Sequence, residues 1–237
     1  MIPIFGNMAI EFKTPSLSRI PTPFAHPDIA VFMLRLDEIH PEVSGNKWFK
    51  LKENIRSAQA LQHDTLLTFG GAWSNHLIAT AAAACHLNMK SIGIVRGWHG
   101  EQNPSPTLLR CRKYGMQLYF VSREVYALKN DAAFLKDLQQ KFGHCYIIPE
   151  GGNNAAGIEG AATIASYIPA DTNLVTLAVG TGTTCCGLRN RLAQDIAVLG
   201  FSVMKNGGYL KESMQNNILS EQTNWALNPD YHYGGFA

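Results

Sequence analysis

The sequence predicts an α/β protein built on mainly parallel β-sheets. Two observations carry this prediction: short apolar runs alternate with helical patterns along most of the chain, and glycine-rich turns join a strand to the next helix at three places. With 46% hydrophobic and 16% charged residues among 237, the chain can also bury a core. Because the loop at 149–152 separates the earlier strands from the later ones, we expect two sheets.

The elements follow in order from these patterns. The first 42 residues hold several prolines and one clear strand, 29–36, and a helix with apolar residues at Trp48, Leu51, Ile55 and Ala58 follows. Apolar runs bounded by turn residues predict further strands at 65–69, 91–96, 116–121, 145–148, 174–179 and 198–204. Apolar residues at helical spacing predict helices at 75–87, near 107–114, 124–142, 156–167 and near 185–192.

Composition argues against several classes of partner. The formal net charge is only +2 and no run of like charges occurs, so we expect neither a nucleic-acid nor a membrane partner. No apolar run approaches the ~18 residues of a membrane span, and the first residues do not resemble a secretory leader, so we expect a cytoplasmic protein. Five cysteines without CxxC spacing fit reduced thiols better than disulfides or a metal site.

Lys47 is the first candidate for chemistry. It follows the turn and cap formers Ser44-Gly45-Asn46 and lies in the first turn of the predicted helix, on the flank of the apolar stripe. Loss of hydration there would disfavour the ammonium form and lower the pKa, as a lysine that forms a Schiff base requires. The alternative is a lysine whose stem covers apolar surface while its ammonium stays in water.

Two of the three glycine-rich turns fit either ligand binding or simple helix capping. In Gly70-Gly71-Ala72-Trp73-Ser74-Asn75-His76 the glycines let the backbone approach a ligand, and the N–H groups at the helix start favour an anion such as a carboxylate. The alternative is plain capping by Ser74 or Asn75. The turn Glu150-Gly151-Gly152-Asn153-Asn154 is a weaker signal, because a flexible loop with an asparagine cap has the same composition.

The third turn, Val179-Gly180-Thr181-Gly182-Thr183-Thr184, has the chemistry of a phosphate site. Backbone N–H groups, threonine hydroxyls and the positive end of a helix dipole converge there. No Gly-Lys-Ser/Thr follows, and the third glycine of a dinucleotide fingerprint is out of place, so neither nucleotide signature is matched. A phosphate site of this kind, combined with a candidate Schiff-base lysine, points to pyridoxal 5′-phosphate as the cofactor.

Four segments in this order resemble the 1-aminocyclopropane-1-carboxylate deaminase / D-cysteine desulfhydrase family. They are Ser44-Gly45-Asn46-Lys47, Gly70-Gly71-Ala72-Trp73-Ser74-Asn75-His76, Pro149-Glu150-Gly151-Gly152-Asn153 and Gly180-Thr181-Gly182-Thr183-Thr184. The resemblance runs from about residue 10 to the end of the chain. It implies the tryptophan synthase β-like fold, fold type II of pyridoxal-phosphate enzymes. It also implies a smaller α/β domain, 49–150, inserted into a larger one made of 1–48 and 151–237, with the cofactor between them.

The resemblance also implies a role for each motif. Lys47 would form the Schiff base beside Asn46, and Asn75 would hydrogen-bond the ring hydroxyl of the cofactor. Ser74, Asn75 and His76 would surround the carboxylate of a small amino-acid substrate, and Ser74 could also relay a proton. The cofactor phosphate would lie against Gly180, Thr181, Gly182, Thr183 and Thr184. A homodimer is implied as well.

Departures from the family pattern bear on the substrate. His76 follows Ser-Asn, as in the desulfhydrase-like members, where cyclopropane deaminases carry glutamine. Phe236 is the best match to a tyrosine of the deaminases; it can stack on a substrate but has no hydroxyl for acid or base chemistry, which leaves Tyr233 as the candidate. We therefore favour β-elimination from D-cysteine or a similar amino acid, giving a 2-oxo acid and ammonia, over cyclopropane ring opening. Family members also continue beyond the position of Ala237, where the partner of the pyridine nitrogen is expected.

Two other hypotheses stay open from the sequence. A nucleotide-dependent α/β protein would use the turn at 180–184 to bind ATP or NAD. A non-catalytic pyridoxal-phosphate-binding protein, or a truncated inactive family member, would bind the cofactor without releasing ammonia or a 2-oxo acid from any amino acid.

Overall fold

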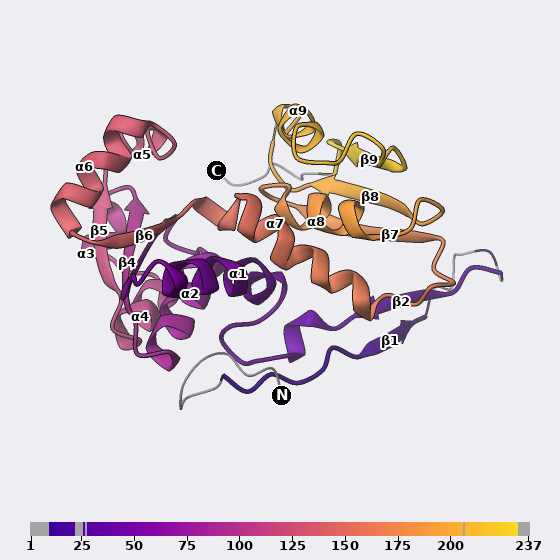
Figure 1. Ribbon diagram of the computed structural model, residues 1–237, viewed down its shortest axis with the longest axis horizontal. Coiled ribbons are helices and arrows are strands. Elements are labelled where there is room, and N and C mark those ends of the chain that lie inside the picture. Colours follow the sequence, from indigo (N-terminus) through magenta and orange to yellow (C-terminus); the bar gives the residue numbers. More distant parts are fainter. Residues whose placement is uncertain (1–9, 22–25, 27, 206, 232–237) are drawn as a thin grey trace.

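The computed structural model describes residues 10–21, 26, 28–205 and 207–231. They form one four-stranded and one three-stranded parallel sheet, together with an antiparallel pair of strands (Figure 1). The predicted α/β class with parallel sheets is therefore confirmed. Tyr233 and Phe236 lie outside the described residues. Within the described residues, no helix is long and apolar enough to cross a membrane.

The four-stranded sheet lies in the first half of the chain, in the order β5-β4-β3-β6. Its strands are β3 (Thr65–Gly70), β4 (Lys90–Arg96), β5 (Gln117–Val121) and β6 (Cys145–Ile148). Apolar clusters join one face to α2 (Asn75–His86) and α4 (Pro106–Lys113), and the other to α5 (Arg123–Ala127) and α6 (Ala132–Phe142). Helices on both faces explain why every residue of β3 is buried. The short helix α3 (His99–Gln102) follows β4.

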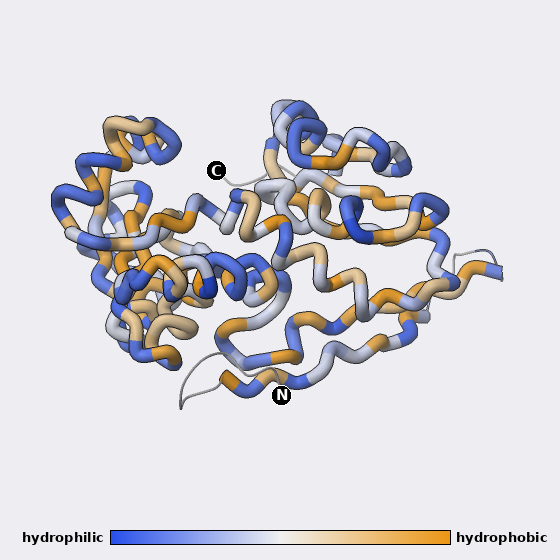
Figure 2. Tube along the Cα trace, in the orientation of Figure 1, coloured by the Kyte–Doolittle hydropathy of each residue, from blue (hydrophilic) through white to orange (hydrophobic). Residues whose placement is uncertain are grey.

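The three-stranded sheet lies in the second half, in the order β7-β8-β9. Its strands are β7 (Leu174–Val179), β8 (Ala197–Ser202) and β9 (Trp225–Asn228). Its helices are α7 (Ala155–Ala162), which continues as the 3-10 helix η3 (Thr163–Tyr167), with α8 (Thr183–Arg191) and α9 (Tyr209–Gln215). Figure 2 shows hydrophobic chain along β7 and β8. A 3-10 turn, η2 (Glu150–Gly152), connects β6 to α7.

Helix α1 (Asn46–Ala60) lies between the two sheets and packs along α7 (Figure 1). One large apolar cluster joins residues of α1 and α2 to residues of α7, α8, β7 and β8. Trp48, Leu51, Ile55 and Ala58, the stripe read from the sequence, are all buried in this cluster. The helix thus shares its core with both sheets. The proposed inserted domain, 49–150, contains the whole four-stranded sheet, and its boundaries stay a prediction.

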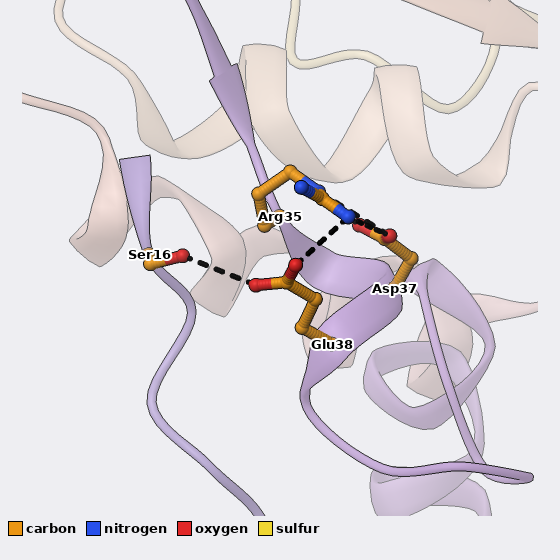
Figure 3. Close-up of polar contacts among 4 residues, drawn as sticks. All are labelled: Ser16, Arg35, Asp37 and Glu38. Carbon is orange, nitrogen blue, oxygen red and sulfur yellow. Dashed lines mark hydrogen bonds and ion pairs between the residues drawn. The ribbon is translucent and has the colours of Figure 1, made fainter. Parts of the chain in front are cut away.

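The N-terminal strands β1 (Leu17–Ile20) and β2 (Val31–Leu34) pair antiparallel and lead into the 3-10 turn η1 (Leu36–Glu38). Arg35 joins the end of β2 to this turn, with its guanidinium 2.7 Å from Asp37 and 2.8 Å from Glu38 (Figure 3). The hydroxyl of Ser16 donates to Glu38 at 3.4 Å, which ties the start of β1 to the same turn (Figure 3). These partners are largely exposed, so solvent screens both ion pairs and they contribute little to stability.

Several predicted boundaries differ from the structure. The helix predicted at 124–142 is two helices, because the carboxylate of Asp131 accepts from the Phe134 N–H at 3.0 Å and starts α6 anew. The helix predicted at 156–167 tightens to a 3-10 helix after Ala162. The strand predicted at 29–36 is shorter, Val31–Leu34, and the strand predicted at 198–204 ends at Ser202. The sequence reading missed β1, α3, α9 and β9.

Candidate functional site

The start of α1 holds the candidate lysine. Gly45 has φ +64°, a conformation that glycine adopts without strain, and this turn brings the chain into the helix at Asn46. The Lys47 ammonium donates to the Asn46 side-chain oxygen at 2.7 Å, and the Asn46 amide donates to the Thr184 hydroxyl at 2.8 Å. Burial lowers the pKa of Lys47. The structure thus brings Asn46, Lys47 and Thr184 together, as the sequence suggested.

Lys50 is a second lysine at the site, which the sequence analysis did not single out. It is 5% exposed, and its ammonium lies 3.4 Å from the Thr181 hydroxyl. Burial, followed by the positive charge of nearby Lys47, lowers the pKa of Lys50 to about 7. The spacing i, i+3 on a helix was the signal that could have placed Lys50 beside Lys47.

The threonines of the third turn form a directed chain of hydrogen bonds. The hydroxyl of Thr183 donates to the Asn153 side-chain oxygen at 3.0 Å. A hydroxyl has a single proton, so in the 2.9 Å contact between Thr181 and Thr183 the donor is Thr181. The oxygen of Thr181 is then left to accept from Lys50. The chain therefore runs from Lys50 through both threonines to Asn153.

The first turn of α8 also offers free donors to this point. Gly182 precedes the helix with φ +82°, and in the described part of the chain no side chain caps its N–H groups. By contrast, Ser74, Ser105, Asp131 and Asn154 each cap a helix with a side-chain oxygen. Uncapped N–H groups and the helix dipole make the start of α8 electropositive.

The loop between β6 and α7 packs tightly against Lys50 of α1 and against Thr181 of the third glycine-rich turn. A side chain on Gly151 would place its Cβ 2.7 Å from the Thr181 methyl group, and one on Gly152 would lie 3.1 Å from Lys50 Cβ. The same Cβ on Gly152 would lie 3.7 Å from the His76 ring. Both glycines have positive φ, +66° and +68°. This turn, a weak signal in the sequence, is therefore a tightly packed part of the site.

Glu150 fixes the start of that loop. Its carboxylate accepts from the Tyr126 hydroxyl at 2.8 Å and lies 3.6 Å from the Lys129 ammonium. Tyr126 is 3% exposed, and burial together with the Glu150 charge raises its pKa. The contact therefore holds the loop against α5.

The first glycine-rich turn carries both a cap and a buried histidine. The Ser74 side chain accepts from the Leu77 N–H at 3.3 Å, so the capping role left open by the sequence is present. Gly70 must be glycine, because a Cβ there would lie 2.6 Å from the Ser74 hydroxyl. Asn75 is exposed, whereas His76 is 3% exposed.

His76 is held as one tautomer by Thr68 of β3. The Thr68 hydroxyl donates to the Ile148 carbonyl at 2.8 Å, so the 2.9 Å contact with His76 Nε2 must be a donation from the ring. The lone pair is then on Nδ1, which is buried and has no hydrogen-bond partner among the described residues. Burial and the charges of Lys50 and Lys47 lower the His76 pKa to about 3, so the ring is neutral.

This tautomer bears on the role implied for His76. A neutral imidazole with a free Nδ1 lone pair accepts hydrogen bonds, whereas a substrate carboxylate needs a donor. Contact with a carboxylate would therefore require His76 to break its bond to Thr68 or to exchange tautomers.

A family model described as "Pyridoxal-phosphate dependent enzyme" matches residues 11–217. The chain belongs to this family. A bifunctional mitochondrial D-cysteine desulfhydrase/1-aminocyclopropane-1-carboxylate deaminase of Arabidopsis thaliana is 32% identical over 197 residues, 73% of this chain and 49% of that protein. A putative 1-aminocyclopropane-1-carboxylate deaminase of Thermotoga maritima is 32% identical over 70% of this chain and 56% of its own length. The chain thus spans about half the length of these relatives, and the resemblance stated from the motifs is confirmed.

The fold agrees with that of solved structures. The crystal structure of a homologue of 1-aminocyclopropane-1-carboxylate deaminase superposes with a TM-score of 0.75 at 24% identity, covering 87% of this chain and 67% of that one. O-ureido-L-serine synthase gives a TM-score of 0.66 at 17% identity, covering 89% and 66%. The predicted tryptophan synthase β-like fold, fold type II, is confirmed.

The residues at the site fit the cofactor of this family. The Thr184 hydroxyl, which accepts from Asn46 and keeps its own proton, forms a donor set suited to a phosphate together with the uncapped N–H groups of α8 and the Lys50 ammonium. Lys47 supplies a partly desolvated amine next to them. Without an anion this cluster has an excess of positive charge, which a phosphate dianion would balance.

The low pKa of Lys50 predicts a pH-dependent cost to folding. The folded chain binds fewer protons than the unfolded chain between about pH 7 and 10, so the Lys50 contribution to stability rises with pH, by at most about 1.4 kcal/mol per pH unit. Lys50→Met removes this term. In chemical denaturation of the cofactor-free protein, we expect the variant to gain most over the wild type at pH 6.5 and progressively less up to pH 8.5. Parallel stability curves would contradict the buried, shifted lysine.

The hydrogen bonds of Thr68 predict the protonation state of His76. In nitrogen-15 NMR spectra, His76 should remain a neutral ring with its proton on Nε2 from pH 8 down to about pH 5. Thr68→Val removes the acceptor of that proton, so the tautomer population should shift toward Nδ1–H. A protonated His76 at pH 6 would overturn this assignment.

Proposed function

We propose that the chain is a pyridoxal-phosphate-dependent deaminase or lyase that converts a small amino acid to a 2-oxo acid and ammonia. The hydrogen-bonded link from Lys47 through Asn46 to Thr184 is the observation that supports this most, because it joins the candidate covalent lysine to the phosphate-type turn. The Arabidopsis relative is named for both D-cysteine desulfhydration and cyclopropane deamination. We favour D-cysteine-type β-elimination, because Phe236 lacks the hydroxyl expected for ring opening.

In this proposal each side chain has a task set by its place. Pyridoxal phosphate, when bound, supplies an electron sink that stabilises negative charge at the substrate α-carbon. Lys47 holds the cofactor and, as a neutral amine, takes the α-proton at Nζ; its burial favours that neutral form. Lys50 and the Thr184 hydroxyl bind the phosphate, with the N–H groups of Gly180, Thr181, Gly182 and Thr183.

The roles of the first turn are also part of the proposal. Asn75, exposed at the start of α2, would reach the ring hydroxyl of the cofactor, and Ser74 with the neighbouring N–H groups would bind the substrate carboxylate. Tyr233 remains the candidate acid or base. The nucleotide-dependent alternative loses its support, because the chain belongs to the pyridoxal-phosphate family. The remaining alternative is a non-catalytic cofactor-binding protein.

We also propose that the chain works as a homodimer in the cytoplasm. The ribbon of β1 and β2 supports self-association, because Leu17, Phe32 and Met33 are each about half exposed on it. The reduced thiols expected of a cytoplasmic protein fit the five cysteines, which are free.

Borohydride reduction tests the covalent lysine. Protein incubated with pyridoxal phosphate should absorb near the visible edge, and reduction should leave a stable adduct that peptide mapping locates on Lys47. Lys47→Ala should lose both the absorbance and the adduct, whereas Lys52→Met, on the same helix, should keep both. An adduct on Lys50 in the wild-type protein would overturn the assignment.

A substrate comparison tests the reaction. With D-cysteine we expect ammonia, hydrogen sulfide and pyruvate, at a kcat/KM at least tenfold above that for ammonia release from aminocyclopropane carboxylate, a difference of about 1.4 kcal/mol in activation free energy. Lys47→Ala with added cofactor controls for the reaction of D-cysteine with free pyridoxal phosphate. A cofactor-loaded protein that releases ammonia from no amino acid would instead support the non-catalytic alternative.

A further inference from the structure

We propose that a cavity on the side of α1 opposite Lys47 is a second binding site, for a small carboxylate with an apolar body. The cavity has a volume of about 250 Å³ and lies between the N-terminal segment, α1 and η3. On a helix with 100° per residue, the lining residues Trp48, Phe49 and Lys52 face away from Lys47 and Lys50. The site is therefore separate from the candidate cofactor site and does not depend on the proposed function.

Aromatic rings make the apolar wall of this cavity. Phe12 of the N-terminal segment stacks on Trp48 with ring centroids 4.2 Å apart, and Tyr167 of η3 meets Phe49 edge to face at 6.1 Å. Trp48 and Phe49 are 2% and 4% exposed, so the half-buried rings of Phe12 and Tyr167 provide the aromatic surface that a ligand can reach. A flat or branched apolar group fits such a wall better than a polar chain does.

Lys52 supplies the polar end, with donors to spare. Its ammonium donates to the Thr163 hydroxyl at 2.5 Å, and the Thr163 hydroxyl donates in turn to the Gly160 carbonyl at 2.7 Å. An ammonium has three N–H donors, so two remain for a ligand. Two acids, Glu53 and Glu159, also act on the charge of Lys52, and Glu53 is itself paired with Arg56 at 2.7 Å. Burial lowers the pKa of Lys52, which an anion in the cavity would reverse.

Charge and size define the class of ligand. Lys13 also lines the cavity, and none of its described lining residues is acidic, so the lining carries two positive charges. The volume lies below the ~300–1,000 Å³ of typical ligand pockets, which excludes nucleotides and other large anions. A small monocarboxylate satisfies both limits: its carboxylate would meet Lys52 and its apolar body the aromatic wall.

The position of the cavity gives binding there a route to the cofactor site. Trp48 and Phe49 line the cavity and stand between Lys47 and Lys50 in the sequence of α1. A ligand against Phe12 and Tyr167, which pack on these two rings, would therefore act on the turn of helix that carries both lysines of the candidate site.

Calorimetric titration of the whole chain, loaded with pyridoxal phosphate, tests the site with phenylacetate as the probe. We expect saturable binding that Lys52→Met weakens at least tenfold and Lys13→Met, at the exposed rim, about threefold. Lys52→Arg should keep the affinity within about threefold, which shows that a folded variant with the charge retains the site. Lys136→Met, remote on α6, is the matched control and should change nothing.

The neutral analogue phenylacetamide separates anion recognition from apolar burial. It should bind at least tenfold more weakly than phenylacetate, because it cannot pair with Lys52. Equal affinities for the two probes would overturn the proposal. So would unchanged phenylacetate binding in Lys52→Met, which would place the probe at the candidate cofactor site, or the lack of saturable binding.

Discussion

The site depends on two lysines one helical turn apart, of which Lys50 is buried and Lys47 half-buried. Lys47 and Lys50 lie on the same face of α1, and the electropositive start of α8 faces them through Thr181 and Thr184. Like charges at this spacing repel, and burial makes each ammonium more costly. Without the cofactor, the pKa of both lysines is lowered, which reduces this repulsion. Their ammonium groups donate to neutral oxygens, Lys47 to Asn46 and Lys50 to Thr181. An anion with several acceptor oxygens is the ligand that such a cluster favours most strongly.

Close packing of α1 with its neighbours keeps the two lysines in place. A Cβ on Gly160 of α7 would fall 2.0 Å from the Phe49 carbonyl, so the backbones of α7 and α1 are in contact between the two lysines. On the other side of the turn, the buried Asn54 side chain donates to the Lys50 carbonyl at 2.8 Å and accepts from Asn154 at 2.8 Å. Rigid elements from both halves of the chain therefore set the distance from Lys50 to the third turn.

The sequence predicted the parts of this site that local pattern determines. The strands ending at Gly70 and Val179 and the glycine-rich turns after them follow from apolar runs and turn chemistry. The sequence analysis missed Lys50, because a helical wheel cannot show that α7 and the loop at 150–153 cover this side chain. The tautomer of His76 depends on a carbonyl 80 residues from Thr68, which no local pattern contains. The break in the helix at Asp131 was readable, since aspartate is a strong cap former.

The two lysines also raise the question of which one reacts with the cofactor. By pKa alone Lys50 would be the better nucleophile at neutral pH, because burial and Lys47 lower its pKa to about 7. Its ammonium, however, lies at Thr181, within the donor set of the phosphate. A bound dianion there would restore the proton affinity of Lys50 and keep it charged, by the same electrostatics that now lower it. Lys47, beside Asn46 at the other end of the donor set, is then the amine left for covalent chemistry. Phosphate binding beside Lys50 therefore also determines that Lys47 is the lysine that reacts with the cofactor.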